Sequence, residues 1–308
     1  MKIVITGATG MIGLALINLL HDEHEIYAII RPSSSNTNLL KDFQNIKIIE
    51  CNLNNLKSIS NEISEADIFF HLGWNGTTGN INRNDNELQL NNIQYTLDAI
   101  ELSERLNCKS FVGTGSQAEY GIQNKILNEK TPINPITSYG IAKYAAGKLG
   151  KNLSDELNVK FCWARILSVY GPGLNNTMIN ACIESILNDK PFDTTPGEQK
   201  WDYLYSSDCA KALYKIAING IDGETYVVGS GKTRTIKEYI IILKNTINPK
   251  FKVNFGKLNY SSNQIMYLCA DISKLKKDTG FEVETTFEEG IKKTIEWYKK
   301  YRGHEKIY

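Results

Sequence analysis

Apolar runs alternate with amphipathic stretches along the first 167 residues. Six short segments are apolar almost throughout rather than at every second position: KIVIT, EIYAII, IKIIE, ADIFFHL, CKSFVGTGS and VKFCWARI. Such runs are typical of parallel strands that are buried on both faces. Helical periodicity follows three of them, over Met11–Leu20, Glu87–Leu106 and Ser138–Leu157. This alternation predicts βαβ units and an α/β fold with a Rossmann-type, doubly wound parallel sheet.

The pattern changes after Leu167. SVYGPGLNNT reads as a loop, and helical periodicity returns over Met178–Leu187, Asp208–Ile218 and Thr286–Tyr301. TYVVG and KVNFG are candidate short strands. We expect residues 1–167 to form the Rossmann domain. Residues 168–308 are expected to form mostly a smaller C-terminal α/β lobe for the substrate, with some segments returning to the first domain.

Composition narrows the class of protein. The 35 Lys and Arg residues nearly balance the 34 Asp and Glu residues, so charge gives no argument for a nucleic-acid or membrane partner. No apolar run approaches the roughly 20 residues of a membrane-spanning helix. The six cysteines form no C-x-x-C pair, which favours reduced thiols and gives no metal site. With no signal peptide before KIVIT, we expect a cytoplasmic protein.

Three glycines lie between the first strand and the first helix. A strand that leads through a glycine turn into a helix places free N–H groups and the positive helix end at one point, which suits a phosphate. Gly7 permits the turn, Gly10 lets a pyrophosphate approach the backbone, and Gly13 lets the helix pack on the strand. We therefore expect a bound dinucleotide at Gly7, Thr9, Gly10, Met11, Ile12 and Gly13.

The end of the second strand bears on the choice of dinucleotide. NAD-binding chains usually carry an acid there, whereas this chain has Ile30 followed by Arg31. A guanidinium suits a 2′-phosphate, with Ser33 as a further donor, so NADP is favoured and NAD remains the alternative. Arg31 stacked on the adenine without a phosphate contact is the other interpretation. Asn52 and Leu53, after the third strand, are expected near the adenine.

A tyrosine and a lysine one helical turn apart are candidates for proton transfer. Tyr139 and Lys143 share one helix face, and a nearby ammonium lowers the pKa of a phenol. Such a tyrosine can exchange a proton with a sugar oxygen while hydride moves to or from a nicotinamide. Ser116, at the end of the preceding strand, can bond the same oxygen. Its alternative role is that of a turn hydroxyl.

The chain resembles the extended short-chain dehydrogenase/reductases, in the NAD-dependent epimerase/dehydratase family that acts on nucleotide sugars. The resemblance is carried, in the family's order, by TGATGMIG, HLGW, NNIQYT, TGSQAEYG, SYGIAK, RILSVYGPG, WDYLYSSDCAKAL and ADISKLKKDTGF. It implies that Ser116, Tyr139 and Lys143 are catalytic, with Tyr139 and Lys143 also touching the cofactor. It further implies that His71, Leu72 and Gly73 line the cofactor, that Asn92 supports that site, and that the chain forms a homodimer through the helices Glu87–Leu106 and Ser138–Leu157.

Two departures from the family pattern narrow the reaction. Family dehydratases carry an Asp-Glu pair after the catalytic hydroxyl, where this chain has Gln117 and Ala118. A carboxamide and a methyl group cannot replace that acid and base. We expect NADPH-dependent reduction of a nucleoside diphosphate 4-keto sugar at C4, and the loop resembles that of CDP-sugar 4-ketoreductases. A 4-epimerase with bound NAD is the alternative, ahead of a dehydrogenase of a non-nucleotide ketone or a non-catalytic binder.

The substrate end of the site has fewer signals. Family members often have an arginine where this chain has Trp201, so the diphosphate contact is missing or moved. Arg165 lies within an apolar strand, where we expect a buried ion pair. The residues expected to contact the substrate are Trp74, Gln117, Asn175, Trp201 and Gln264.

Overall fold

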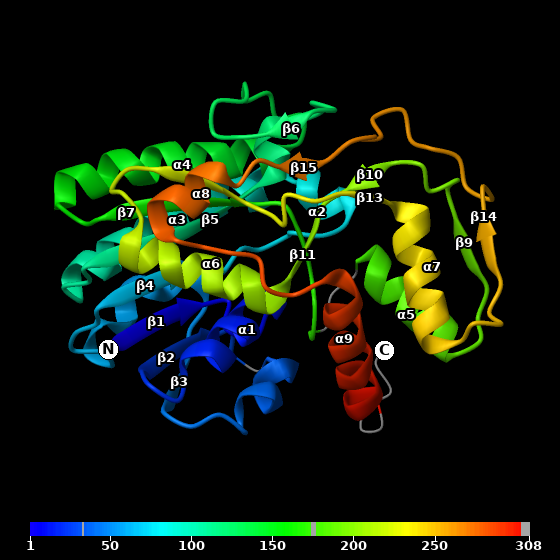
Figure 1. Cartoon of the computed structure of the whole chain (residues 1–308). Coiled ribbons are helices and arrows are strands. Elements are labelled where there is room, and N and C mark those ends of the chain that lie inside the picture. Colours follow the sequence, from blue (N-terminus) through cyan, green and yellow to red (C-terminus); the bar gives the residue numbers. More distant parts are fainter. Residues whose placement is uncertain (33, 174–176, 303–308) are drawn as a thin grey trace.

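The computed structural model describes residues 1–32, 34–173 and 177–302. In these residues a seven-stranded parallel sheet forms the centre of the molecule (Figure 1). From one edge to the other its strands are β12 (Thr225–Val228), β7 (Phe161–Ile166), β5 (Ser110–Ser116), β4 (Ile68–His71), β1 (Lys2–Thr6), β2 (Glu25–Ile30) and β3 (Ile46–Glu50). The strand order reverses direction beside β1, which confirms the doubly wound Rossmann-type fold.

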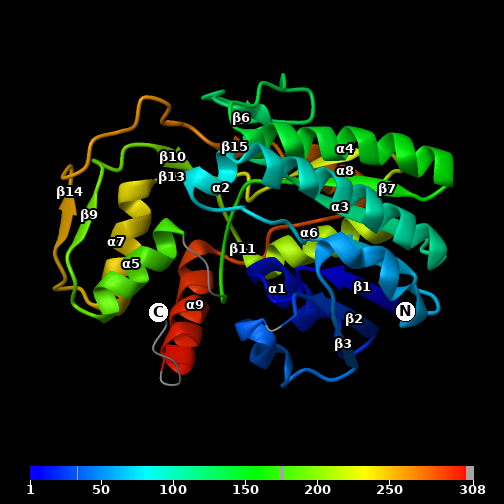
Figure 2. The same cartoon turned by 180° about the vertical axis from the view of Figure 1, so that it is seen from behind.

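Both faces of the sheet are covered, which explains why its strands are apolar throughout. On β1, Ile3 and Ile5 face a core shared with α1 (Met11–Leu20), α6 (Ser206–Asn219) and α8 (Ser273–Thr279). Val4 faces the opposite core, with η2 (Leu53–Asn61), α3 (Asn86–Arg105) and α4 (Ser138–Leu157). Figure 2 shows α3 and α4 lying side by side on that face. Successive strand residues point to opposite faces, so most positions of the inner strands are buried, whereas the edge strand β3 has exposed residues.

A second group of helices lies beside the sheet. α5 (Met178–Leu187), α7 (Ile236–Ile247) and α9 (Phe287–Arg302) share a separate apolar core (Figure 1). Four pairs of short strands lie within and beside this group: β8 (Ser168–Tyr170) with β11 (Tyr203–Tyr205), β9 (Phe192–Thr194) with β14 (Val253–Phe255), β10 (Lys200–Trp201) with β13 (Arg234–Thr235), and β6 (Ile126–Leu127) with β15 (Cys269–Ala270).

The sequence prediction differs from the structure mainly beyond residue 167. The sequence predicts that some segments of 168–308 return to the first domain; TYVVG supplies β12 to the central sheet, and α6 packs on α1. The predicted loop SVYGPGLNNT begins with the strand β8, whose residues gain a ladder only by pairing with the distant β11. The helices α7, α8 and α2 (Asn80–Asn84) and the 3-10 helices η1 (Ser35–Leu40) and η3 (Gln117–Tyr120) were not predicted.

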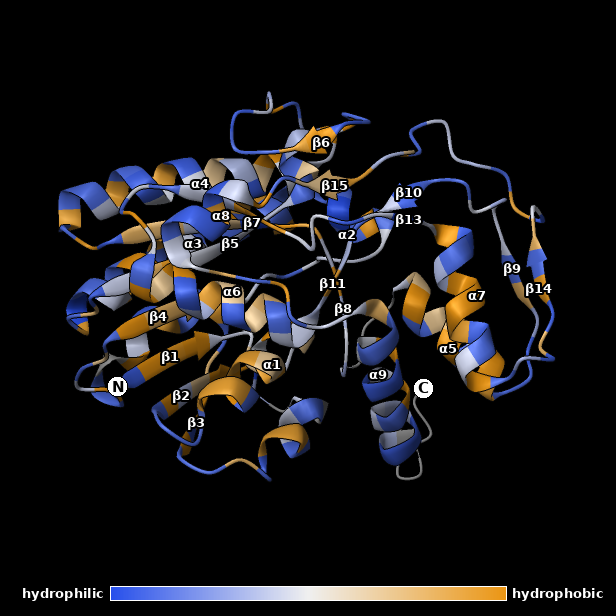
Figure 3. Cartoon of the chain, in the orientation of Figure 1, coloured by the Kyte–Doolittle hydropathy of each residue, from blue (hydrophilic) through white to orange (hydrophobic). Residues whose placement is uncertain are grey.

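Hydropathy follows this arrangement. Figure 3 shows the middle of β1 apolar, whereas α3 and α4 carry polar residues among apolar ones. None of the helices in the described residues combines the length and the apolar character that crossing a membrane requires.

Candidate active site

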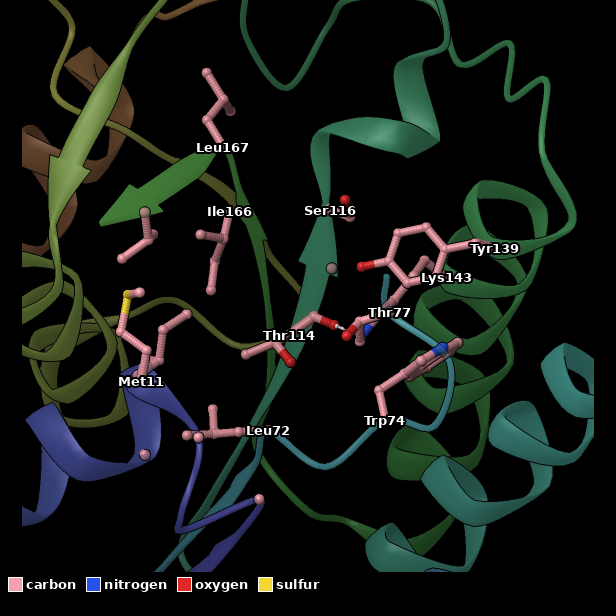
Figure 4. Close-up of a pocket in the computed structure, with 16 residues that line it drawn as sticks. Met11, Leu72, Trp74, Thr77, Thr114, Ser116, Tyr139, Lys143, Ile166 and Leu167 are labelled. Carbon is pink, nitrogen blue, oxygen red and sulfur yellow. Dashed lines mark hydrogen bonds between the residues drawn. The ribbon is translucent and has the colours of Figure 1, made fainter. Parts of the chain in front are cut away.

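A cavity of about 290 Å³ opens at the carboxyl ends of the central strands. Ligands of open α/β sheets bind at this edge, where the strand order reverses. The cavity brings together segments far apart in sequence, from the glycine turn to the start of the second helix group (Figure 4). Its lining residues are Gly7, Gly10, Met11, Ile12, Gly13, Leu72, Trp74, Thr77, Thr114, Gly115, Ser116, Tyr139, Lys143, Ile166, Leu167 and Val169.

The glycine turn is shaped by close backbone contacts. Gly7 has φ of +67°, and a Cβ atom there would lie 2.8 Å from the Gly73 amide nitrogen. A Cβ atom on Gly13 would lie 2.4 Å from the Gly7 carbonyl oxygen. Gly10 caps α1 without any side-chain hydrogen bond to the helix. The first N–H groups of α1 are therefore available to an anionic ligand.

A buried histidine fixes the neighbouring turn. The Thr6 hydroxyl accepts a hydrogen bond of 3.0 Å from the Gly73 amide and lies 3.0 Å from His71 Nδ1. Either the hydroxyl or the ring nitrogen can donate in this pair, depending on which ring nitrogen carries the proton. Burial, with a smaller effect of the Lys143 charge, lowers the pKa of His71 to about 3. His71 is therefore neutral and structural rather than a general base.

Tyr139 and Ser116 meet inside the cavity. Tyr139 comes from the first turn of α4, which Thr137 caps by accepting a hydrogen bond from the Gly140 amide. Figure 4 shows the phenol oxygen directed toward Ser116 and the cavity. Ser116 ends β5 and caps η3, where its hydroxyl accepts a bond from the Ala118 amide. Ser116 thus has the turn role and also lies beside the tyrosine.

The lysine of this group is turned away from the phenol oxygen. Lys143 donates a hydrogen bond of 2.6 Å to the Thr114 carbonyl, and its ammonium lies 3.7 Å from the centre of the Trp74 ring. Only 3% of Lys143 is exposed. Burial lowers the pKa of Lys143 to about 7, opposed by the charge of Glu119. Part of the Lys143 population is therefore neutral near pH 7 in this arrangement.

The pKa of Tyr139 does not follow the simple expectation from the Tyr-x-x-x-Lys spacing. Burial raises the pKa of Tyr139, and the hydrogen bond with Ser116 and the charge of Arg83 oppose that rise. The Lys143 ammonium lies 5.9 Å from the centre of the Tyr139 ring and donates to the Thr114 carbonyl.

Some of the predicted cofactor residues line the cavity, and others lie elsewhere along the same edge of the sheet. Gly7, Gly10, Met11, Ile12, Gly13, Leu72, Tyr139 and Lys143 line the cavity. Arg31 and Asn52 are exposed at the ends of β2 and β3, along the same edge of the sheet. Thr9 is half-buried in the turn, and Leu53 packs against the buried Gly73. Ser33 lies outside the described residues.

Asn92 lies behind the cavity rather than in its wall. Only 1% of its surface is exposed, and its side chain bonds both the amide and the carbonyl of Asn75. It holds in place the loop that follows β4, which agrees with a supporting role.

The predicted substrate residues are only partly brought together. Trp74 lines the cavity, and Gln117 follows Ser116 with its buried Oε1 lacking a hydrogen-bond partner among the described residues. Trp201 donates 2.7 Å to the Ser168 hydroxyl, and Gln264 donates to the neighbouring Ile265 carbonyl; neither lines the cavity. Asn175 lies outside the described residues.

Sequence reasoning missed three residues around the site. Thr114 supplies the carbonyl for Lys143, and its position two residues before Ser116 on the same strand face was an available signal. Arg83 lies over the Tyr139 ring, and Gln89 accepts a hydrogen bond from Trp74 Nε1. No motif points to Arg83 or Gln89, because they arrive by tertiary packing of the loop after β4.

The expected ion pair of Arg165 is confirmed. Its Nε lies 2.5 Å from Glu119 Oε2, and 6% and 0% of the two side chains are exposed. The pair lies beside η3, immediately after Ser116, and holds the end of β5 in place.

A family model, the NAD dependent epimerase/dehydratase family, matches residues 3–229. Among curated proteins, CDP-abequose synthase of Salmonella muenchen is 27% identical over 307 residues, covering 96% of this chain and 97% of that protein.

Solved structures give the same result for the fold. A UDP-N-acetylglucosamine 4-epimerase from Methanobrevibacter ruminantium, in complex with UDP-N-acetylmuramic acid, matches with a TM-score of 0.87 and 25% identity over 97% of this chain and 98% of that chain. A UDP-glucuronic acid 4-epimerase from Bacillus cereus, in complex with NAD, matches with a TM-score of 0.84 and 22% identity over 98% and 99% of the two chains.

Proposed function

The chain belongs to the NAD-dependent epimerase/dehydratase family, and from that premise we propose that it reduces a nucleoside diphosphate 4-keto sugar at C4 with NADPH. The observation that carries the proposal is the cavity itself. It joins an uncapped helix N-terminus behind a glycine turn to a tyrosine, a serine and a lysine. A dinucleotide and a carbonyl group can meet there.

The residues present fit a nicotinamide dinucleotide. The Gly7 turn leaves no room for a Cβ atom, and the free N–H groups of α1 suit the pyrophosphate. Arg31, Asn52 and Leu53 would hold the adenosine end, and Tyr139 and Lys143 the nicotinamide end. When bound, the dinucleotide supplies the hydride that goes to C4 of the sugar.

The chain's own residues then manage the proton. Tyr139 donates its phenolic proton to the oxygen at C4 as the carbonyl becomes a hydroxyl, and it is reprotonated from solvent. Ser116 bonds the same oxygen and orients it. Lys143, once redirected by a bound ligand, can bond ribose hydroxyls and favour the phenolate. Proton transfer of this kind typically contributes ~10²–10⁴-fold to a rate.

Two residue choices support reduction over the family's other reactions. Gln117 and Ala118 provide no acid and base for loss of water, so 4,6-dehydration is disfavoured. Arg31 is an exposed cation where NAD-binding chains carry an acid, which favours the 2′-phosphate of NADPH. The likeness to CDP-abequose synthase over 96% of the chain supports a CDP-sugar as the substrate class.

The second candidate is a 4-epimerase with tightly bound NAD. The likeness to a UDP-N-acetylglucosamine 4-epimerase supports it, and the same residues would serve: Tyr139 takes the C4 hydroxyl proton and returns it after the sugar turns. The two reactions differ in their demand for external NADPH.

The discriminating experiment supplies NADPH and a nucleoside diphosphate 4-keto-6-deoxyhexose, made in place from the nucleoside diphosphate glucose by a 4,6-dehydratase. Oxidation of NADPH with formation of the 4-hydroxy sugar supports the reductase. Co-purified NAD, with interconversion of hexose epimers and no NADPH consumption, supports the epimerase instead. A thermal-shift screen with UDP, CDP, GDP and dTDP tests the substrate class, because no stabilisation by any of them would point to a non-nucleotide ketone.

The proposal includes a homodimer in a reducing compartment such as the cytoplasm. α3 and α4 expose apolar residues on their outer faces, with Leu90 63%, Ile141 54% and Leu149 47% exposed, and helix pairs of this kind can form a four-helix interface. All six cysteines are free and buried, as suits reduced thiols. A monomeric mass in light scattering would reject the dimer.

A further inference from the structure

A short helix outside the predicted motifs lies against the catalytic tyrosine. α2 follows β4, and its Arg83 places the guanidinium carbon 4.2 Å from the centre of the Tyr139 ring. Arg83 also donates 3.2 Å to the Thr77 carbonyl, at the rim of the cavity. At this distance a planar cation is attracted to an aromatic face and restricts the ring's movement.

The charge of Arg83 is not neutralised locally. Among the described residues no carboxylate forms an ion pair with it, in contrast to Arg165 and Arg234, which bond Glu119 and Glu288. The other cation of the site, Lys143, is directed to the Thr114 carbonyl and the Trp74 ring. The guanidinium is therefore the uncompensated positive charge that lies directly on the phenol.

The loop that presents Arg83 is held by buried polar side chains. Gln89, 1% exposed, accepts from Trp74 Nε1 at 2.9 Å and donates to the carbonyls of Gly76 and Asn82. Asn92 bonds the backbone of Asn75. Such fully used amides fix a loop more firmly than exposed contacts do. The position of Arg83 over Tyr139 is thus built into the fold.

We propose that Arg83 is a positioning residue for Tyr139, fixing the phenol ring and favouring its ionised form through a guanidinium stacked on its face. This rests on the proposed function, in which Tyr139 exchanges the proton. In the Tyr-x-x-x-Lys motif the lysine alone stabilises the ionised phenol. Our proposal gives a share of this role to Arg83, in the segment after β4.

The groups facing Tyr139 fix the direction of the effect. Arg83 favours the phenolate because its charge is opposite, and the Ser116 hydroxyl acts in the same direction. Glu119 opposes ionisation, but it is paired with Arg165. Lys143 lies 5.9 Å from the ring centre with its ammonium directed elsewhere. Removing Arg83 therefore raises the pH at which Tyr139 ionises.

The test needs no substrate. Tyrosines are labelled with carbon-13 at the ring carbon that bears the oxygen, whose shift reports the ionised fraction, and the Tyr139 signal is assigned by its loss in Tyr139→Phe. We expect Arg83→Gln to move the Tyr139 titration upward by about one pH unit, which is a tenfold smaller ionised fraction at a fixed pH. Arg83→Lys, which keeps the charge without the planar stack, recovers at least half of that shift.

Arg105→Gln is the matched control. Within the described part of the chain Arg105 also donates to backbone carbonyls alone, those of Glu101 and Lys57, and it lies at the far end of α3. It should leave the Tyr139 titration unchanged. An unchanged titration in Arg83→Gln overturns the proposal, as does an equal shift in Arg83→Lys and Arg83→Gln. Absence of turnover in every variant, including the parent chain, would instead count against the proposed function.

Discussion

Two buried polar groups of residues flank the end of β5, and they differ in how completely their charges are satisfied. The Glu119 cluster consists of Glu119, Trp163 and Arg165. The carboxylate, 0% exposed, accepts from Arg165 Nε, Trp163 Nε1 and the Ser116 amide. The Lys143 cluster consists of Thr114, Tyr139 and Lys143. The Lys143 ammonium donates to the Thr114 carbonyl and lies over the Trp74 ring, but no carboxylate among the described residues pairs with it.

This difference in charge compensation distinguishes a cluster that stabilises the fold from one that is suited to binding a ligand. A buried charge is tolerated when hydrogen bonds and a counter-charge replace water, as they do around Glu119. Lys143 carries a burial cost that its neighbours offset only in part, and it faces a cavity. An incompletely compensated buried charge of this kind is typical of functional sites, where a bound ligand supplies the missing contacts. The following predictions compare the two clusters by removing one member at a time.

The largest effect on turnover is expected from Tyr139→Phe. The phenol oxygen is the proton donor in the proposed reaction, so its loss should lower kcat by about 10³-fold. The ring and its contacts with Trp74 and Arg83 remain, and the Kd for the dinucleotide should stay within about twofold, as measured by titration calorimetry. Near-normal turnover in this variant would remove Tyr139 from the mechanism.

The largest effect on stability is expected in the Glu119 cluster. Arg165→Met leaves a fully buried carboxylate without its counter-charge, which should lower the free energy of unfolding by about 3–5 kcal/mol. Denaturant unfolding measures it. The double variant Glu119→Gln with Arg165→Met should recover part of the loss, because no unpaired charge remains. A loss below about 1 kcal/mol in Arg165→Met would mean that the pair is not holding η3.

The same kind of change in the Lys143 cluster should have the opposite sign. Burial lowers the pKa of Lys143 from 10.5 to about 7, so between these values the unfolded chain binds a proton that the folded chain does not. Burial of the protonated Lys143 destabilises the folded chain. This destabilisation has its full size below about pH 7 and disappears as the pH rises toward 10.5. Lys143→Met should therefore be more stable than the parent chain near neutral pH, and inactive.

We expect that gain to be about 1–3 kcal/mol at its maximum, since the lost bond to Thr114 and contact with Trp74 offset part of it. Melting temperatures across the pH range measure it, and the gain should shrink as the pH rises through the window. Lys151→Met on the same helix is the control, because Lys151 is solvent-accessible and paired with Asp155. A destabilised Lys143→Met at neutral pH would contradict the comparison.

The sequence predicts the fold well where a pattern is local. Continuous apolar runs and 3.6-residue periodicity give six strands of the central sheet, and the ranges of α1, α4 and α5 agree with the structure. β14 falls within the predicted strand KVNFG, whereas β8, β9, β10 and β13 were missed, because strands of two or three residues exist only through partners far away in the chain. β12 reads as a strand, but nothing in TYVVG indicates which sheet it joins.

The candidate site likewise contains residues that local motifs predict and contacts that depend on tertiary packing. Gly7, Ser116, Tyr139 and Lys143 belong to local motifs and do line one cavity. The direction of the Lys143 ammonium depends on Trp74, and the position of Arg83 depends on Gln89 and Asn92, which no spacing rule connects. Whether Ser116, Tyr139 and Lys143 catalyse, and whether Arg31 selects NADPH, stay predictions.

The smallest effects come from two tryptophans that make the same kind of hydrogen bond in different surroundings. Trp163, 2% exposed, donates 3.0 Å to Glu119, and the half-buried Trp74 donates 2.9 Å to Gln89. Trp163→Phe removes a donor from a buried carboxylate and should cost about 1–2 kcal/mol without changing kcat. Trp74→Phe should cost less than that, about 1 kcal/mol, because the acceptor that loses its donor is the neutral Gln89 amide rather than a carboxylate.

Turnover should show the reverse order. The phenyl ring of Trp74→Phe still covers Lys143 but attracts the ammonium less strongly than an indole does, so kcat should fall several-fold and its pH profile should shift. Unfolding curves and pH–rate profiles measured on both variants provide the comparison. Equal losses of stability with no shift in either pH profile would show that the aromatic face over Lys143 has no electrostatic part. The Lys143 cluster would then be a second packing site like the one around Glu119, rather than a cation held ready for a ligand.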